Sequence, residues 1–171
     1  TADADLIFGR DGGDDITGGD ASDCISGGAG ADGIDGGPGD DVLISDGGAD
    51  VLRGGQGDDV LALPDVDFST TRRLIGGTGT DRLRLDGNAL HLDLTAIADN
   101  RLVDIEQIDI TGDGFNTLTL NAREVLNISS HSNRLRVFRG FGDTVNIGSG
   151  WTSQPDETIG GVTFDVFLQG A

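Results

Sequence analysis

Eight aspartates recur at one place in a glycine-rich repeat, each of them two residues before an isoleucine or leucine. Seven of these eight follow one another at intervals of nine residues, and the last comes after a longer gap. They are Asp5, Asp14, Asp23, Asp32, Asp41, Asp50, Asp59 and Asp81. Calcium takes about six to eight oxygen ligands at about 2.3–2.6 Å and tolerates irregular geometry. Aspartates at so constant a spacing therefore predict a series of calcium sites.

The repeat that carries these aspartates has a turn half and a strand half. Its clearest copies are GGAGADGID (27–35), GGPGDDVLI (36–44), GGQGDDVLA (54–62) and GGTGTDRLR (76–84). Glycines at repeat positions one, two and four allow a tight curl of the backbone. The three residues after the aspartate form one short strand whose middle, aliphatic residue faces one way. Two nonapeptides then make one coil of a parallel β-roll, so that residues eighteen apart stack.

The charge of the repeat region requires a cation. Residues 1–62 contain fifteen Asp and two Arg, a net charge of −13, and such a segment should not fold unaided. Stacking at eighteen residues pairs the aspartates and predicts five ions, and a sixth follows if Asp59 stacks on Asp81. The first five pairs are Asp5 with Asp23, Asp23 with Asp41, Asp41 with Asp59, Asp14 with Asp32, and Asp32 with Asp50. Magnesium fits less well because it demands a tighter octahedron and keeps its waters.

The repeats resemble those of the RTX (repeats-in-toxin) family. The resemblance implies secretion by Gram-negative bacteria through a type I system, with a right-handed parallel β-roll that folds in extracellular calcium. It also implies that calcium is bound by the eight aspartates together with turn carbonyls. On this chain those carbonyls are expected from Gly12, Gly19, Gly28, Gly30, Gly37, Gly39, Gly48, Gly55 and Gly57. Three units depart from the pattern. The first is truncated and has Asp3 at repeat position four. In the second, Arg10 takes a glycine position, and in a later unit Ser45-Asp46 replaces a pair of glycines.

The chain divides into three parts. Residues 1–62 form the nonapeptide roll, and residues 63–85 contain an enlarged loop from Pro64 to Thr70 and the last nonapeptide. Asp65 or Asp67 in this loop is expected to cap the other side of the roll. Residues 86–171 lose the glycine pattern but keep short alternating segments, which predict strands with irregular turns. The fold class is therefore all-β, a parallel β-roll with an irregular β-rich C-terminal half that caps its open end.

Short elements within the C-terminal half are readable as well. The alternating segments are 90–94, 105–110, 117–120, 134–138, 144–147 and 162–168. Asn121, with a glutamate three residues later, has the capping signature of a short helix. A further helical turn is expected over residues 95–100. The half is read as a continuation of the coil without a regular calcium series.

One outward face of the roll is unusually apolar. Its residues are Cys24, Val42 and Val60, with Ser26, Ile44 and Ala62 in the next column. The opposite face carries Asp15, Thr17, Gly33, Asp35, Val51 and Arg53, as a solvated sheet should. Two interpretations stay open: an adjoining segment or partner covers the apolar face, or its residues are ordinary exposed apolar side chains.

Composition excludes several classes of function. A net charge of −19 argues against nucleic acid and anionic membranes as partners, and no apolar run is long enough to span a membrane. No catalytic motif surrounds His91 or His131, so the chain is not expected to be an enzyme. The single Cys24 excludes an internal disulfide.

The sequence thus predicts a calcium-triggered folding and scaffolding module of a large, adhesin-like extracellular protein. Its partners would be calcium, flanking domains of the parent protein and the type I secretion machinery, with the parent at the cell surface of a Gram-negative bacterium. Two alternatives remain. The C-terminal half could bind a sugar or peptide, with Trp151 as a stacking residue, or the chain could be the secretion tail of a hydrolase or epimerase.

Overall fold

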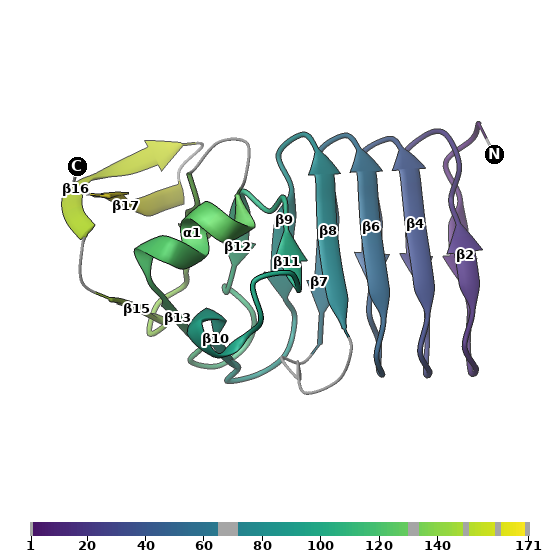
Figure 1. The fold of residues 1–171 in the computed structure, drawn as a ribbon, viewed down its shortest axis with the longest axis horizontal. Helices are drawn as coiled ribbons and strands as arrows, with labels where there is room; N and C mark the ends of the chain where they lie inside the picture. The colour runs from purple at the N-terminus through teal and green to yellow at the C-terminus, as the bar shows by residue number, and fades with distance from the viewer. Residues whose placement is uncertain (1, 65–71, 130–133, 149–150, 160–161, 170–171) are drawn as a thin grey trace.

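The computed structural model describes residues 2–64, 72–129, 134–148, 151–159 and 162–169, with the backbone alone from residue 151 onward. The chain folds as an all-β solenoid of stacked parallel strands, with one short helix among the described residues (Figure 1). The N-terminal coils are regular, and the C-terminal coils are wider and irregular.

Two parallel sheets face each other in the roll. The first contains β1 (Leu6–Phe8), β3 (Cys24–Ser26), β5 (Val42–Ile44), β7 (Val60–Leu63) and β9 (Arg82–Leu85). The second contains β2 (Asp15–Thr17), β4 (Gly33–Pro38), β6 (Val51–Gln56) and β8 (Arg73–Thr78). Ile25 pairs with Leu43, and Ile34 with Leu52, which confirms coils of two nonapeptides. These aliphatic residues are fully buried between the sheets and form the core.

The register survives the four-residue insertion after Leu63. Leu61 pairs with Leu83 and Leu52 with Leu74, so Asp81 stacks on Asp59 as expected. Strand β8 begins at Arg73, after the expected loop, and runs to Thr78. Residues 65–71, with Asp65 and Asp67, lie outside the described residues, so the predicted cap by these aspartates stays a prediction.

The C-terminal half extends the roll and adds a third sheet. The first sheet continues through β12 (Gln107–Asp109) and β14 (Arg136–Phe138), and the second ends with β11 (Leu102–Val103). The third sheet contains β10 (His91–Asp93), β13 (Thr117–Leu120) and β15 (Thr144–Ile147), in parallel register. The coil from β9 to β12 contains strands of all three sheets, and in the next coil α1 takes the place of a strand of the second sheet. The stacking interval therefore exceeds eighteen residues here.

Two short helical segments border these coils. The predicted helix is confirmed as α1 (Ala122–Ile128), and the Asn121 side chain caps it by accepting from the amides of Arg123 and Glu124. The Ile105 amide donates to the Ile128 carbonyl at 3.0 Å, so α1 lies against the end of the second sheet, where an open edge would invite further strands. The expected helical turn near residue 95 is a 3-10 turn, η1 (Leu94–Ala96).

The last two strands depart from the predicted coil. Strands β16 (Trp151–Ile159) and β17 (Val162–Gln169) pair in an antiparallel hairpin, so the parallel coil does not continue to the C-terminus. The sequence did contain the signal, because Gly160-Gly161 between two alternating runs is typical of a tight hairpin. Trp151 begins β16, but its side chain, and with it the proposed stacking role, lies outside the described residues, as does His131.

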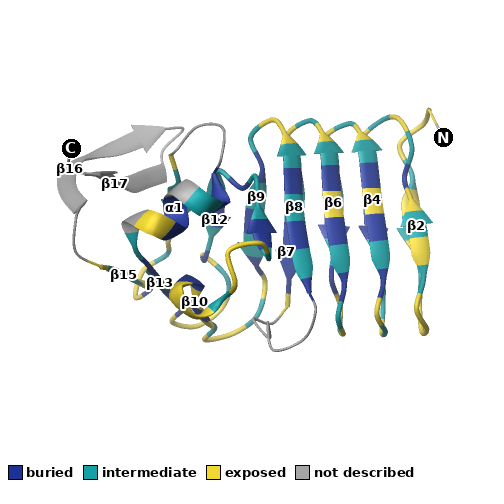
Figure 2. Cartoon of the chain, in the orientation of Figure 1, coloured by how far each residue is buried: buried dark blue, intermediate teal, exposed yellow. Residues whose placement is uncertain are grey.

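The two outer faces of the roll differ in exposure as well as in composition. On the second sheet Asp15, Asp35 and Arg53 are exposed (Figure 2). On the first sheet Ala62 is fully buried, and the remaining members of the apolar face, Cys24, Val42, Ile44 and Val60, are half-buried. Leu6 and Phe8 continue this face at β1 and are 66% and 60% exposed. Neither helical segment of the described chain is long and apolar enough to cross a bilayer.

Candidate metal sites

The eight aspartates lie at the two edges of the roll, where glycine turns join the sheets. Asp5, Asp23, Asp41, Asp59 and Asp81 precede strands of the first sheet and define the first edge. Asp14, Asp32 and Asp50 precede strands of the second sheet and define the second edge. Each aspartate from Asp23 onward uses its Oδ1 in the same way, as acceptor from a backbone amide one coil earlier. These bonds run from Asp5 to Asp23 (2.7 Å), Asp14 to Asp32 (2.8 Å), Asp23 to Asp41 (2.7 Å), Asp32 to Asp50 (3.0 Å), Asp41 to Asp59 (2.8 Å) and Asp59 to Asp81 (2.9 Å).

The second carboxylate oxygen has no partner in the protein at six of these positions. The Oδ2 atoms of Asp14, Asp23, Asp32, Asp41, Asp59 and Asp81 are buried and make no hydrogen bond. A buried charge without a partner is strongly unfavourable. Six such atoms at equivalent places are therefore the donor set that a hard cation requires, and the residues fit calcium.

A main-chain carbonyl lies beside five of these six oxygens, all but that of Asp32, in space that a side chain would fill. A Cβ added to Gly36 would overlap with Asp41 Oδ2 and lie 2.7 Å from the Gly54 carbonyl oxygen. Gly18 relates in the same way to Asp23 and Gly36, and Gly54 to Asp59 and Gly76. The glycine at repeat position one is thus required by sterics. The glycine donors expected from the sequence all lie at repeat positions two and four, so these position-one carbonyls are an addition to the expected set.

The predicted carbonyl donors lie in the same turns. The carbonyl oxygens of Gly12, Gly19, Gly30, Gly37, Gly39, Gly55 and Gly57 each point at the glycine one coil later. All the predicted glycines, including Gly28 and Gly48, have φ between +91° and +148°, which favours glycine. Their role as calcium ligands stays a prediction.

The second edge ends in a network built from protein groups alone. Ser45, at repeat position one, donates its hydroxyl to Asp50 Oδ2. Arg73 pairs with Val51, so Arg72 takes the stacking position above Asp50, where the next aspartate would be. Arg72 is 1% exposed, and its Nη2 donates to the predicted ligand carbonyl of Gly48 at 3.1 Å. A guanidinium therefore supplies positive charge where the series of carboxylates stops.

The third sheet repeats the stacking geometry with hydrogen-bond donors in place of a cation. The Leu90 amide donates to Asn116 Oδ1, and the Asn116 amide to Asp143 Oδ1, both at 2.8 Å. The second polar atom of each side chain is satisfied by the protein. Asn116 Nδ2 donates to the carbonyls of Ile110 and Gly112, and Asp143 Oδ2 accepts from the Gly140 amide. This half thus requires no ion at these positions.

Burial changes the proton affinity of the first edge. It raises the pKa of Asp59 to about 7, and the charges of Asp81 and Asp41 add to this. Burial likewise raises the pKa of Asp81 to about 7, with the charges of Glu106 and Asp58 as further causes. The pKa of Asp41 is raised for the same reasons. Without a cation, these carboxyls therefore favour the protonated form.

Acidification should consequently stabilise the calcium-free protein. A carboxyl whose folded pKa is raised from 3.8 to about 7 contributes stability that is fully present below pH 3.8 and is lost as the pH rises through 7. We expect the folded fraction of dialysed, calcium-free protein to increase between pH 8 and pH 5, as measured by far-UV circular dichroism. With calcium the sign reverses, because protons compete with the ion. A calcium-free protein that unfolds on acidification over this range would contradict the prediction.

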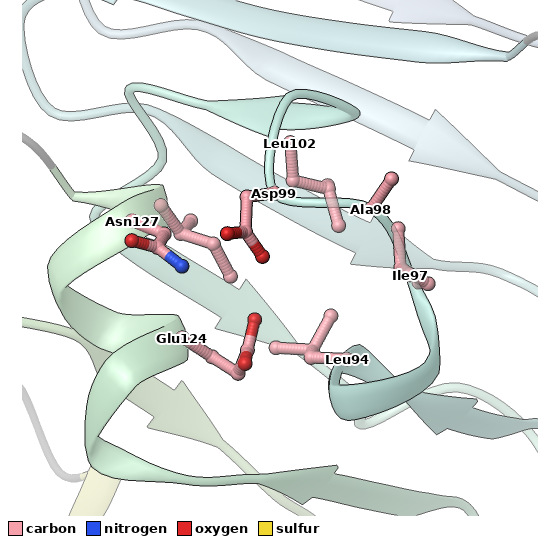
Figure 3. Close-up of a pocket in the computed structure, with 8 residues that line it drawn as sticks. Leu94, Ile97, Ala98, Asp99, Leu102, Glu124 and Asn127 are labelled. Carbon is pink, nitrogen blue, oxygen red and sulfur yellow. The ribbon is translucent and has the colours of Figure 1, made fainter.

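A small pocket in the C-terminal half is the other candidate site. It lies between η1, β11 and α1 (Figure 3), and its walls combine apolar Leu94, Ile97 and Leu102 with the polar side chains of Asp99 and Glu124. Burial raises the pKa of Glu124, and the charge of Asp99 adds to the effect. Neither this pocket nor any other described part of the chain contains three or more His, Cys, Asp or Glu grouped as a metal site.

Comparison with known proteins agrees with this geometry. A family model described as "RTX calcium-binding nonapeptide repeat (4 copies)" matches residues 1–34 and 27–61. The match covers the coils that contain all the aspartates of the second edge and the first four of the first edge. Searches of the curated proteins and of the solved structures gave no match.

Proposed function

Since residues 1–61 of this chain are RTX calcium-binding nonapeptide repeats, we propose that it is a calcium-triggered folding and scaffolding module of a large extracellular protein exported by a type I system. The observation that carries the proposal is the set of six buried Oδ2 atoms without a hydrogen-bond partner. A roll that leaves these charges unpaired is disfavoured, and a roll that gives each of them a calcium ion is stable.

Calcium supplies the driving force in this proposal. Binding free energy becomes folding free energy when the unfolded chain lacks a formed site. Extracellular calcium modules have dissociation constants of about 10⁻⁴ to 10⁻³ M. A chain with such sites stays unfolded at low calcium inside the cell and becomes rigid outside. The chain itself is not an enzyme in this proposal, and the parent protein is adhesin-like and located at the cell surface.

A far-UV circular dichroism titration tests the proposal. We expect a cooperative gain of β signal on addition of calcium, its loss on chelation, and little gain with magnesium at the same ionic strength. Magnesium is the matched control because it has the same charge but demands tight octahedral geometry. A chain whose β signal is complete in chelator and unchanged by calcium would overturn calcium-triggered folding.

A ligand-binding role for the C-terminal half is the second candidate, and the pocket of Figure 3 favours it. The carboxyl groups of buried Glu124 and of Asp99 provide acceptors for a sugar hydroxyl or a peptide amide. Glycan-array and peptide-array binding in calcium, compared between the wild type and Glu124→Gln, distinguishes this role from pure scaffolding. Binding that the substitution abolishes would support it, and the absence of binding would remove it.

A secretion tail of a hydrolase or epimerase is the remaining candidate, and the sequence of the parent protein beyond this chain decides it. The apolar face formed by Cys24, Val42, Ile44, Val60 and Ala62 adds a proposed contact surface, either for a flanking domain or for a partner. Val42→Asp should then weaken the association of this chain with that domain or partner, as measured by analytical ultracentrifugation, without changing the calcium midpoint of folding. An unchanged association would assign these residues to ordinary solvent exposure.

A further inference from the structure

The first edge does not end at Asp81. Gln107 pairs with Arg82, so Glu106 takes the stacking position directly after Asp81. The Asp81 amide donates to Glu106 Oε2 at 3.0 Å, the same bond that each earlier aspartate amide makes to the carboxylate one coil later. A glutamate outside the nonapeptide region thus continues the series of stacked carboxylates.

The unpartnered oxygen of Asp81 lies beside a carbonyl of the following coil, as in the earlier units. The Oδ2 atoms of Asp14, Asp23, Asp41 and Asp59 each lie beside the position-one carbonyl of the following coil, which for Asp59 is that of Gly76. The corresponding neighbour of Asp81 Oδ2 is the Asp104 carbonyl, because a Cβ on Gly76 would lie 2.5 Å from Asp81 Oδ2 and would overlap with Asp104 O. Asp81 is fully buried, and its Oδ2 makes no hydrogen bond.

The backbone around Asp104 reproduces the turn with fewer residues. Val103 pairs with Ile75, which places Asp104 over the position-one glycine Gly76, and Asp104 adopts a left-handed φ of +54°. Asp104 precedes Glu106 by two positions, whereas Gly76 precedes Asp81 by five. The longer glutamate side chain suits this shortened turn. Gly77 and Gly79 have φ of +119° and +139°, close to those of Gly55 and Gly57, so the last nonapeptide keeps the turn conformation of the earlier units.

From these observations we propose that Asp81, Glu106 and the Asp104 carbonyl bind one further calcium ion, at the junction between the roll and the C-terminal half. This inference rests on the proposed calcium function and extends it beyond the matched repeats. The Ser129 hydroxyl donates to Glu106 Oε1 at 3.4 Å and holds the carboxylate toward Asp81. The ion thereby links the last nonapeptide to β12 and to the end of α1.

Calcium stoichiometry of the full chain tests the site. We expect Glu106→Gln to bind one equivalent of calcium less than the wild type, by equilibrium dialysis with radioactive calcium at a concentration that saturates folding. Glutamine keeps an acceptor for the Asp81 amide, and its Nε2 can donate to Asp81 Oδ2, so the fold is retained. Asp35→Asn, which removes one carboxylate from an exposed position on β4, is the control and should keep the wild-type number.

The outcomes separate the two proposals. An unchanged stoichiometry in folded Glu106→Gln would overturn the junction site alone, and a wild type that binds no calcium would overturn the proposed function with it. If Glu106→Gln does not fold, Glu106→Asp keeps the charge but shortens the side chain. That variant should lose one equivalent at low calcium and regain it at about tenfold higher calcium. Binding of Glu106→Asp identical to the wild type would contradict the site.

Discussion

Gly54→Ala should be among the most damaging single substitutions in this chain. The added Cβ would overlap with Asp59 Oδ2 and lie 2.6 Å from the Gly76 carbonyl oxygen, so it occupies the space in which the ion between Asp59 and Asp81 would lie. Overpacking of this kind costs about 1–3 kcal/mol, and loss of the ion adds to it. The free energy of unfolding at a fixed calcium concentration should therefore fall by about 1–3 kcal/mol or more, and the calcium midpoint of folding should rise.

Gly47→Ala is the matched control for this substitution. Gly47 lies in the neighbouring turn, has no left-handed φ, and an added Cβ would meet nothing within 4 Å. Its calcium midpoint, from the same circular dichroism titration, should stay near that of the wild type. Equal midpoints for Gly54→Ala and Gly47→Ala would show that the position-one glycines are not required to shape a cation site.

Asp59→Asn should change stability in opposite directions with and without calcium. Asp59 serves two predicted ions, one shared with Asp41 and one with Asp81, so with calcium the variant should be less stable than the wild type and its calcium midpoint should rise. Without calcium the same variant should be more stable than the wild type, since burial and the charges of Asp81 and Asp41 disfavour ionised Asp59. The asparagine Oδ1 still accepts from the Asp41 amide, and its Nδ2 can donate to the Gly76 carbonyl, as Asn116 Nδ2 does to Ile110 and Gly112.

Asp35→Asn removes the same charge from an exposed, outward position on β4 and is the control. Urea unfolding in calcium and in chelator measures the free energy of unfolding of all three proteins. Asp35→Asn should differ little from the wild type in either condition, because exposed charges contribute little. A calcium-free Asp59→Asn that is less stable than the wild type would contradict the idea that burial and mutual repulsion of the stacked carboxylates destabilise the calcium-free roll.

The regular part of the fold was predictable because it depends on local repetition. A nine-residue interval fixes which aspartates and which aliphatic residues share a column, so the pairing of Ile25 with Leu43 followed from counting. The stacking of Asp81 on Asp59 also followed, since a four-residue insertion can be placed in one loop. The helix after Asn121 was predictable for the same reason, because its capping residues are adjacent in sequence.

Features that depend on tertiary contacts were not predictable from the repeat. Glu106 follows no glycine turn, and only the pairing of Gln107 with Arg82 places it after Asp81. Nothing in the sequence distinguishes Arg72 from other arginines near strands, because its place above Asp50 depends on the length of the preceding loop. The strands of the third sheet are separated by irregular turns of different lengths. No fixed sequence interval therefore predicts that they pair. The hairpin was missed although its Gly-Gly signal was present.

The hydrogen-bonded stacking of Leu90, Asn116 and Asp143 gives folding a direction. A solenoid behaves as a one-dimensional array in which each unit gains most from an already ordered neighbour. The stacked polar groups of the third sheet need no ion, so these coils can order first and serve as the template on which the next coil closes. Folding should then advance like a zipper toward the N-terminus as calcium rises. Hydrogen exchange at half-saturating calcium should therefore protect Leu83 before Leu52 and Leu52 before Ile16, and a uniform loss of protection would rule out this polarity.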